Sequence, residues 1–96
     1  MSLLQELRRR KAEILPILER YRARRPRVFG SVARERETMD SDIDVLVDLP
    51  DDLTLFDIAQ LQVDLEDLLR RRVDLATEAE LDPGIRIRAL RDAVPL

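Results

Sequence analysis

The chain has 96 residues, which suits one small domain over residues 1–96 and leaves no room for a second, substrate-holding domain. It contains no cysteine and no histidine, which excludes disulfides, thiolate metal sites and the commonest general base. Any metal must therefore be held by oxygen ligands, which favours Mg²⁺ or Mn²⁺. The net charge of −3 argues against a purely electrostatic nucleic-acid binder, although clustered arginines leave RNA open as a substrate.

The first segment carries apolar side chains at helical spacing from Leu3 to Tyr21. This spacing predicts an amphipathic helix from about Ser2 to Arg24, with Ser2 as its N-cap. Pro16 interrupts the pattern, so we expect a kink or two shorter helices at that point. No apolar run approaches the length of a membrane span, and the N-terminal residues are too polar for a secretory signal. We therefore expect a cytoplasmic protein with no membrane partner.

The rest of the chain alternates between strand-like and helix-like patterns. In chain order the predicted elements are a strand at 27–29, a helical turn at 31–34, an exposed loop at 35–41, a strand at 43–49, a helix at 55–69 with Thr54 as its cap, a strand at 72–76 and a helix at 83–93. The order α-β-α-β-α-β-α predicts the α+β class, with a short mixed β-sheet packed by helices.

Asp42 and Asp44 stand two residues apart at the start of the strongest predicted strand. Alternation along a strand places both carboxylates on one face and Ile43 on the other. Two such acids can share a divalent cation, and without one each disfavours the ionisation of the other. An Asp-x-Asp pair is expected by chance in so aspartate-rich a chain, so the pair alone indicates little.

The surroundings of the pair carry more information. Gly30, one of only two glycines, is followed by Ser31 at the end of a predicted strand, where backbone amides and a hydroxyl can approach a phosphate. Asp74 lies in a later apolar strand, where a buried acid needs a partner such as a metal. If the two strands are neighbours, Asp74 reaches the same site. Alternatively, it lies on an edge strand and faces water or pairs with Arg71 or Arg72.

Together these segments resemble the minimal nucleotidyltransferases of the DNA polymerase β-like superfamily. Their signature is Gly-Ser, a spacer of about ten residues, Asp-x-Asp on a strand and a later acid on a neighbouring strand, and it is matched here by FGSVAR, SDIDVLVDL and RRVDLAT. The resemblance runs from about Leu4 to Leu96. In one departure, Glu35 stands where the family usually has glycine. A left-handed backbone there would cost a non-glycine residue about 1 kcal/mol or more.

The resemblance implies a small layered nucleotidyltransferase fold and a set of acidic metal ligands. Asp42 and Asp44 would hold two Mg²⁺ ions, or Mn²⁺, that bridge the triphosphate of ATP. Asp74 would complete the metal site and help to deprotonate the attacking hydroxyl. Two-metal sites of this kind stabilise both the attacking and the leaving oxygen of an in-line displacement.

The resemblance also implies nucleotide-binding residues. Gly30 and Ser31 would hold the phosphates, and Arg34 would steady them or pair with a catalytic acid. A solvated surface arginine is the alternative interpretation of Arg34.

The implied function is transfer of a nucleoside monophosphate, most often AMP from ATP, to a partner protein. A chain this short has little left to enclose an acceptor, so we expect a surface group on another macromolecule. By resemblance the partner is a HEPN-domain toxin, and the chain is its antitoxin. Two alternatives stay open: a non-catalytic antitoxin that neutralises its partner by binding alone, and transfer to RNA ends or a small molecule. The sequence leaves self-association open.

Overall fold

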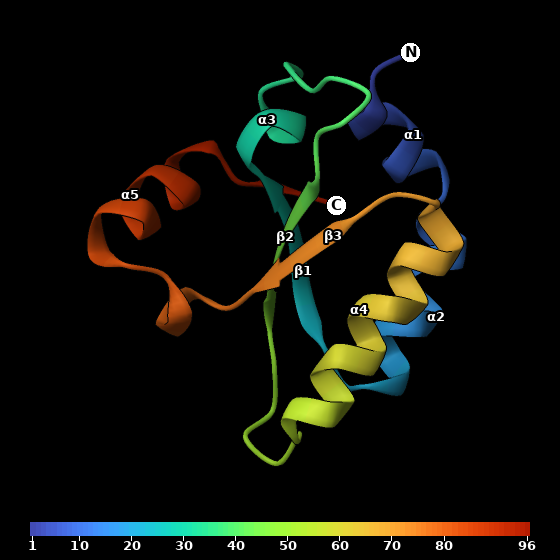
Figure 1. Cartoon of the computed structure of the whole chain (residues 1–96), viewed down its shortest axis with the longest axis vertical. Coiled ribbons are helices and arrows are strands. Elements are labelled where there is room, and N and C mark those ends of the chain that lie inside the picture. The colour runs from blue at the N-terminus through green and yellow to red at the C-terminus, as the bar shows by residue number, and fades with distance from the viewer.

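A computed structural model describes all 96 residues, which fold as a four-stranded sheet between two layers of helices (Figure 1). The helices are α1 (Leu3–Arg9), α2 (Lys11–Arg20), α3 (Gly30–Ala33), α4 (Leu55–Leu69), the short 3-10 helix η1 (Glu78–Glu80) and α5 (Pro83–Asp92). The strands are β1 (Arg24–Phe29), β2 (Ile43–Asp48), β3 (Val73–Ala76) and β4 (Val94–Pro95). No helix has both the length and the apolar character needed to cross a membrane. The α+β class with a mixed sheet is confirmed.

The strand order is β3-β2-β1-β4. β1 runs antiparallel to both β2 and β4, whereas β2 and β3 are parallel. The parallel pair is joined through α4, as a crossover connection requires. Its register sets Asp44 of β2 directly beside Asp74 of β3, and the antiparallel register sets Phe29 of β1 opposite Asp44.

The two faces of β2 differ in character because its side chains alternate. Ile43, Val45 and Val47 are buried in the main core, on the side of α1, α2 and α4. Asp44 faces the other side, which is covered only in part by α3, η1 and α5 (Figure 1). The alternation predicted from the sequence thus places the acid on the less covered face of the sheet.

The predicted break in the N-terminal helix is real, but its position at Pro16 was wrong. The chain turns at Arg10, which ends α1 and begins α2, and Pro16 lies inside a continuous α2. The turn lets Leu4 and Leu7 of α1 reach the core beside α3 while α2 packs along α4. Pro16 is exposed, so solvent can hydrate the carbonyl that its missing N–H leaves free.

The helix caps follow the sequence closely. The side chains of Ser2 and Thr54 each accept a hydrogen bond from the backbone N–H of the residue three positions on, in complete capping boxes. Two short elements were not predicted, η1 and β4. β4 has two residues and exists only because it pairs with β1, so no local pattern marks it.

Candidate active site

The three acids singled out from the sequence lie on neighbouring parts of the sheet. Asp44 is half-buried in β2, Asp42 is exposed one residue before that strand, and Asp74 is exposed on β3. β3 lies at the edge of the sheet and beside β2, so Asp74 is both on an edge strand and next to the strand of Asp44. The Asp74 carboxylate nevertheless forms no ion pair and stands beside Asp44 in the parallel register. The register therefore brings together the acids that the sequence separates by thirty residues.

The environment of Asp44 disfavours its charged form. Its pKa is raised from 3.8 to about 6, mainly because burial removes water from the carboxylate, and also because Asp74 and Asp42 add negative charge nearby. Arg34 acts in the opposite direction but does not compensate. A half-buried acid with a raised pKa beside two like charges is a candidate functional residue. A cation bound here would relieve both the desolvation and the repulsion.

Gly30 is the one position in this region where no side chain fits. A Cβ atom built on it would overlap Oδ2 of Asp44 and lie 3.1 Å from Cγ of the same carboxylate. The residue also has φ of +71°, in the left-handed region that favours glycine. Gly30 thus lets the turn from β1 into α3 approach the Asp44 carboxylate. Ser31 follows as the second residue of α3 and is partly exposed.

Glu35 occupies the glycine-type position that the sequence comparison with the family pointed to. Its φ is +55°, and the N–H of Glu35 donates to the carbonyl of Val32 (3.0 Å) while that of Arg36 donates to Ser31 (2.8 Å). This pair of bonds is a Schellman motif, in which the left-handed residue after the helix is usually glycine. The turn therefore keeps a left-handed backbone despite the side chain, with the strain that this implies.

Arg34 lies at the end of α3, close enough to Asp44 to influence its ionisation. Its Nη1 donates to Oδ2 of Asp92 in α5, at 2.9 Å. The two residues border a pocket of about 230 Å³ between α3 and α5, whose lining is Phe29, Gly30, Arg34, Ile85, Arg88, Ala89 and Asp92. Asp92 was missed in the sequence, because nothing in the last helix marks a partner for an arginine near the chain's first glycine.

A second pocket, of about 470 Å³, lies on the Asp42 side of the site. Its lining is Met39, Asp40, Ser41, Asp42, Arg70, Arg71 and Arg72. A hollow of about 490 Å³ elsewhere, lined by residues such as Lys11, Arg25 and Leu96, includes none of the three acids. We place the candidate site at the three acids, because the acids and not the size of a cavity offer the chemistry. The pocket of about 470 Å³ includes Asp42, and the pocket of about 230 Å³ includes Gly30 and Arg34 but none of the three acids.

The donor chemistry at the site fits a hard divalent cation. Asp42, Asp44 and Asp74 offer only carboxylate oxygens, the ligands preferred by Mg²⁺ and Mn²⁺, and their mutual repulsion would be relieved by one. As the side chains lie, however, no three acids form a group that could hold a metal ion. Binding would therefore require these carboxylates to be drawn together.

Comparisons with known proteins show the family of the chain. The model of the family described as "Nucleotidyltransferase domain" matches residues 5–96. Protein adenylyltransferase MntA of Thermococcus cleftensis is 41% identical over 76 residues, which are 79% of this chain and 77% of that relative.

Solved structures agree on the fold. One described as a minimal nucleotidyltransferase is 46% identical, has a TM-score of 0.84 and is covered over 97% of its length by the whole of this chain. A crystal structure described as a toxin-antitoxin with AMP-PNP has a TM-score of 0.74 at 21% identity. The aligned part is 88% of this chain and 69% of the chain in that structure, and at that identity the likeness shows the fold alone.

Proposed function

Because the chain belongs to the nucleotidyltransferase domain family, we propose that it transfers AMP from ATP to a hydroxyl group of a partner protein, with Mg²⁺ as cofactor. The observation that carries the proposal is the register of β2 and β3, which sets Asp44 beside Asp74 while Gly30 lies against the Asp44 carboxylate. The name of the relative MntA, a protein adenylyltransferase, supports AMP as the transferred group and a protein as the acceptor.

The transfer balances as an in-line displacement. The oxygen of the acceptor hydroxyl forms a bond to the α-phosphorus of ATP, and the bond from that phosphorus to the bridging oxygen of the β-phosphate breaks. Pyrophosphate leaves with the electron pair of the broken bond. The proton of the hydroxyl passes to a carboxylate, for which exposed Asp74 is the candidate because solvent and a second protein can reach it.

The other site residues would bind and orient the triphosphate. Gly30 permits close approach of the backbone, Ser31 adds a hydroxyl donor, and Arg34 supplies a positive charge at the end of α3. Asp42, Asp44 and Asp74 would hold Mg²⁺, which when bound neutralises phosphate charge and stabilises the attacking and leaving oxygens.

We further propose that the partner is a HEPN-domain toxin and that the chain acts as its antitoxin. The toxin-antitoxin structure with AMP-PNP supports this role through its fold. A further solved structure of the same fold is described as the toxin-antitoxin MntA-HepT, and it shares the name MntA with the relative from Thermococcus cleftensis. Asp42 and Asp74 are exposed, so an acceptor carried by another molecule can reach them.

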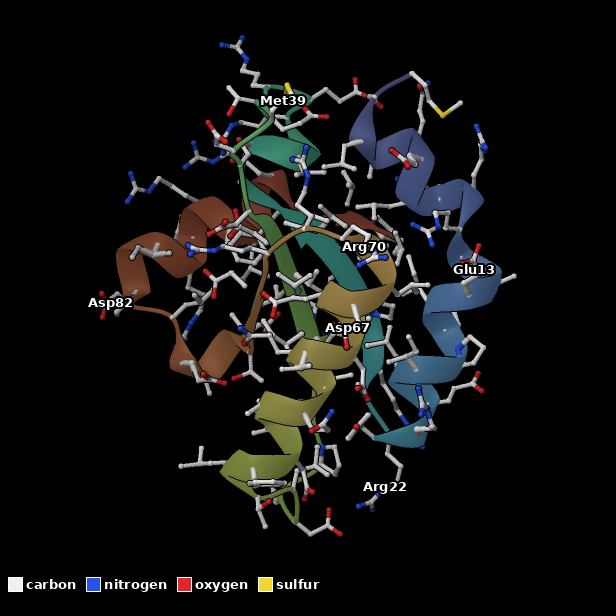
Figure 2. The ribbon with its side chains drawn as sticks, turned by 45° about the vertical axis from the view of Figure 1, so that its right-hand side comes forward. Glu13, Arg22, Met39, Asp67, Arg70 and Asp82 are labelled. Atoms are coloured by element: carbon white, nitrogen blue, oxygen red, sulfur yellow. The ribbon has the colours of Figure 1, made fainter.

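The test is a transfer assay with ATP labelled on the α-phosphate. The purified chain and Mg²⁺ are offered the protein product of the neighbouring gene, an RNA and an aminoglycoside in parallel. We expect label only on the protein, and none when Asp42 and Asp44 are both changed to Asn. Asp67→Asn, which removes an exposed acid on α4, is the matched control and should keep transfer (Figure 2). Label on RNA or aminoglycoside alone would replace the proposed acceptor.

A second candidate function is neutralisation by binding alone. It is favoured by the strained Glu35 turn and by the absence of a ready-made three-acid metal group. The two functions differ in a toxicity assay in living cells. If the chain acts by catalysis, the Asp42→Asn/Asp44→Asn variant fails to protect cells from the toxin although it still co-purifies with it. Full protection by this variant would establish the binding-only function.

A further inference from the structure

Arg71 makes two hydrogen bonds to the loop that leads into the candidate site. Its Nη1 atom donates to the backbone carbonyls of Thr38 and Ser41, each at 3.1 Å. Asp42 follows Ser41 directly. One guanidinium group thus attaches the segment immediately before an acid of the site to the connection between α4 and β3.

The segment that Arg71 holds is a closed turn. The N–H of Thr38 donates to Oγ of Ser41 at 2.8 Å, and the N–H of Ser41 donates to the carbonyl of Thr38 at 3.2 Å. Both carbonyls bound by Arg71 therefore belong to one small rigid unit, and fixing them fixes its orientation. Met39 at the outer end of this turn is 91% exposed, so no packing from that side holds it (Figure 2).

The backbone around Arg71 is anchored independently of this loop. The carbonyl of Arg72 accepts from the N–H of Ile43 at 2.9 Å, and the N–H of Val73 donates to Oε2 of Glu66 at 2.9 Å. Arg70 caps α4 in a left-handed conformation. The guanidinium of Arg71 therefore extends from a fixed support to an exposed loop.

The two neighbouring arginines lack these contacts. Arg70 and Arg72 line the same pocket of about 470 Å³ and are exposed, yet neither side chain donates a hydrogen bond to the loop. Both carry the same charge as Arg71 and are its immediate neighbours in the sequence. The contribution of Arg71 can thus be separated from a general effect of positive charge near the acids.

We propose that Arg71 is a positioning residue: by holding the turn Thr38–Ser41, it sets the place of Asp42 relative to Asp44 and so the affinity of the site for its metal–nucleotide complex. This inference rests on the nucleotidyl transfer proposed above. Groups that orient metal ligands from outside the ligand set typically change metal affinity by about 10–100-fold when removed.

The first test needs neither metal nor activity. Hydrogen exchange is measured on the full chain in EDTA for the wild type, Arg71→Ala and Arg72→Ala. We expect the amides of Thr38 and Ser41, which are hydrogen-bonded within the turn, to exchange roughly tenfold faster in Arg71→Ala, as the loss of hydrogen bonds to a charged donor implies, and to be unchanged in Arg72→Ala. Exchange that is the same in both variants would overturn the structural part of the proposal.

The second test measures the consequence for binding. Mg²⁺ is titrated at a fixed AMP-PNP concentration, and the rise in melting temperature is followed. We expect the Mg²⁺ concentration for half the rise to increase about tenfold or more in Arg71→Ala, less than threefold in Arg72→Ala, and to recover partly in Arg71→Lys, which keeps a donor and the charge. Equal shifts in the two alanine variants would overturn the positioning role.

The outcome also separates this inference from the proposed function. If the wild type shows no rise with Mg²⁺ and AMP-PNP, nucleotide binding itself is refuted and the positioning role falls with it. If the wild type responds and Arg71→Ala matches it, only the positioning role is wrong.

Discussion

At the scale of single residues, Glu35 is the clearest departure from what the local backbone favours. It adopts φ of +55° at the left-handed position of a Schellman motif, where glycine has no Cβ to strain. We predict that Glu35→Gly stabilises the protein by about 1 kcal/mol, because relief of strain exceeds the added flexibility of the unfolded chain.

A thermal melt checks this prediction. A gain of about 1 kcal/mol raises the melting temperature of a chain of this size by roughly 4–8 °C. Glu35→Ala is the control: it removes the same charge but keeps a Cβ, and should leave the midpoint nearly unchanged. A lower midpoint for Glu35→Gly would mean that the side chain stabilises the turn.

The role proposed for Asp44 in function opposes the stability of the metal-free chain. Its pKa is raised to about 6 by burial and by the charges of Asp74 and Asp42, so the ionised form is unfavourable in the folded, metal-free chain. One pKa unit corresponds to about 1.4 kcal/mol, and solvent screening at a half-buried position reduces the total. We predict that Asp44→Asn stabilises the metal-free protein by about 1–2 kcal/mol.

Urea denaturation at pH 7.5 in excess EDTA measures this gain. Asp67→Asn serves as the control, since it removes one exposed negative charge from α4, a helix that carries none of the three site acids (Figure 2). The account of the site is contradicted if Asp44→Asn destabilises the chain, because the carboxylate would then be making a favourable contact in the absence of metal.

At the scale of elements, α2 is continuous through Pro16, where the sequence predicts a kink or the end of a helix. Pro16 lies in the interior of the helix and is exposed. It removes one intrahelical hydrogen bond, and proline costs about 3 kcal/mol relative to alanine in a helix interior. We predict that Pro16→Ala raises the free energy of unfolding by about 1–3 kcal/mol, and that Lys11→Ala in the same helix changes it by less than about 0.5 kcal/mol.

Circular dichroism during urea denaturation tests the Pro16 prediction. The helical signal before the transition should be nearly the same in wild type and variant, because α2 is already continuous. A large gain in helical signal with Pro16→Ala would show that the helix is broken at the proline in solution.

The elements that could be predicted from sequence are those with a long periodic pattern and a cap. The helix at 55–69 was predicted with its bounds and with Thr54 as cap, and the strand beginning at Ile43 with its buried face. The turn at Arg10 could not be predicted, because the segments before and after it continue the same apolar spacing. The two helices differ only in the elements they pack against. β4 depends wholly on pairing with β1.

Some parts of the candidate site could likewise be predicted from the sequence, and others could not. Gly30 and the acids could be predicted because scarce residues and a fixed spacing mark them. The Arg34–Asp92 pair joins residues 58 positions apart, and the two carbonyls held by Arg71 carry no signal in the side chains of the sequence. Contacts to backbone atoms and between distant surface residues follow from the fold alone.

At the scale of the whole molecule, the site is exposed on one side of the sheet. The main core lies between the sheet and α1, α2 and α4, whereas the acids lie on the face that α3 and α5 cover only in part (Figure 1). Under the proposed function, the nucleotide would bind on this face and the acceptor would come from a second molecule. It accords with a small enzyme that acts on a second protein.

Intact-mass spectrometry of the partner protein is the most direct test of whether this site transfers AMP to it. The HEPN-domain protein is purified after co-expression with the wild-type chain or with its Asp42→Asn/Asp44→Asn variant. We predict a partner heavier by one or more AMP groups with the wild type and an unmodified partner with the variant. An unmodified partner in both cases, with the toxin neutralised by both, would contradict the claim.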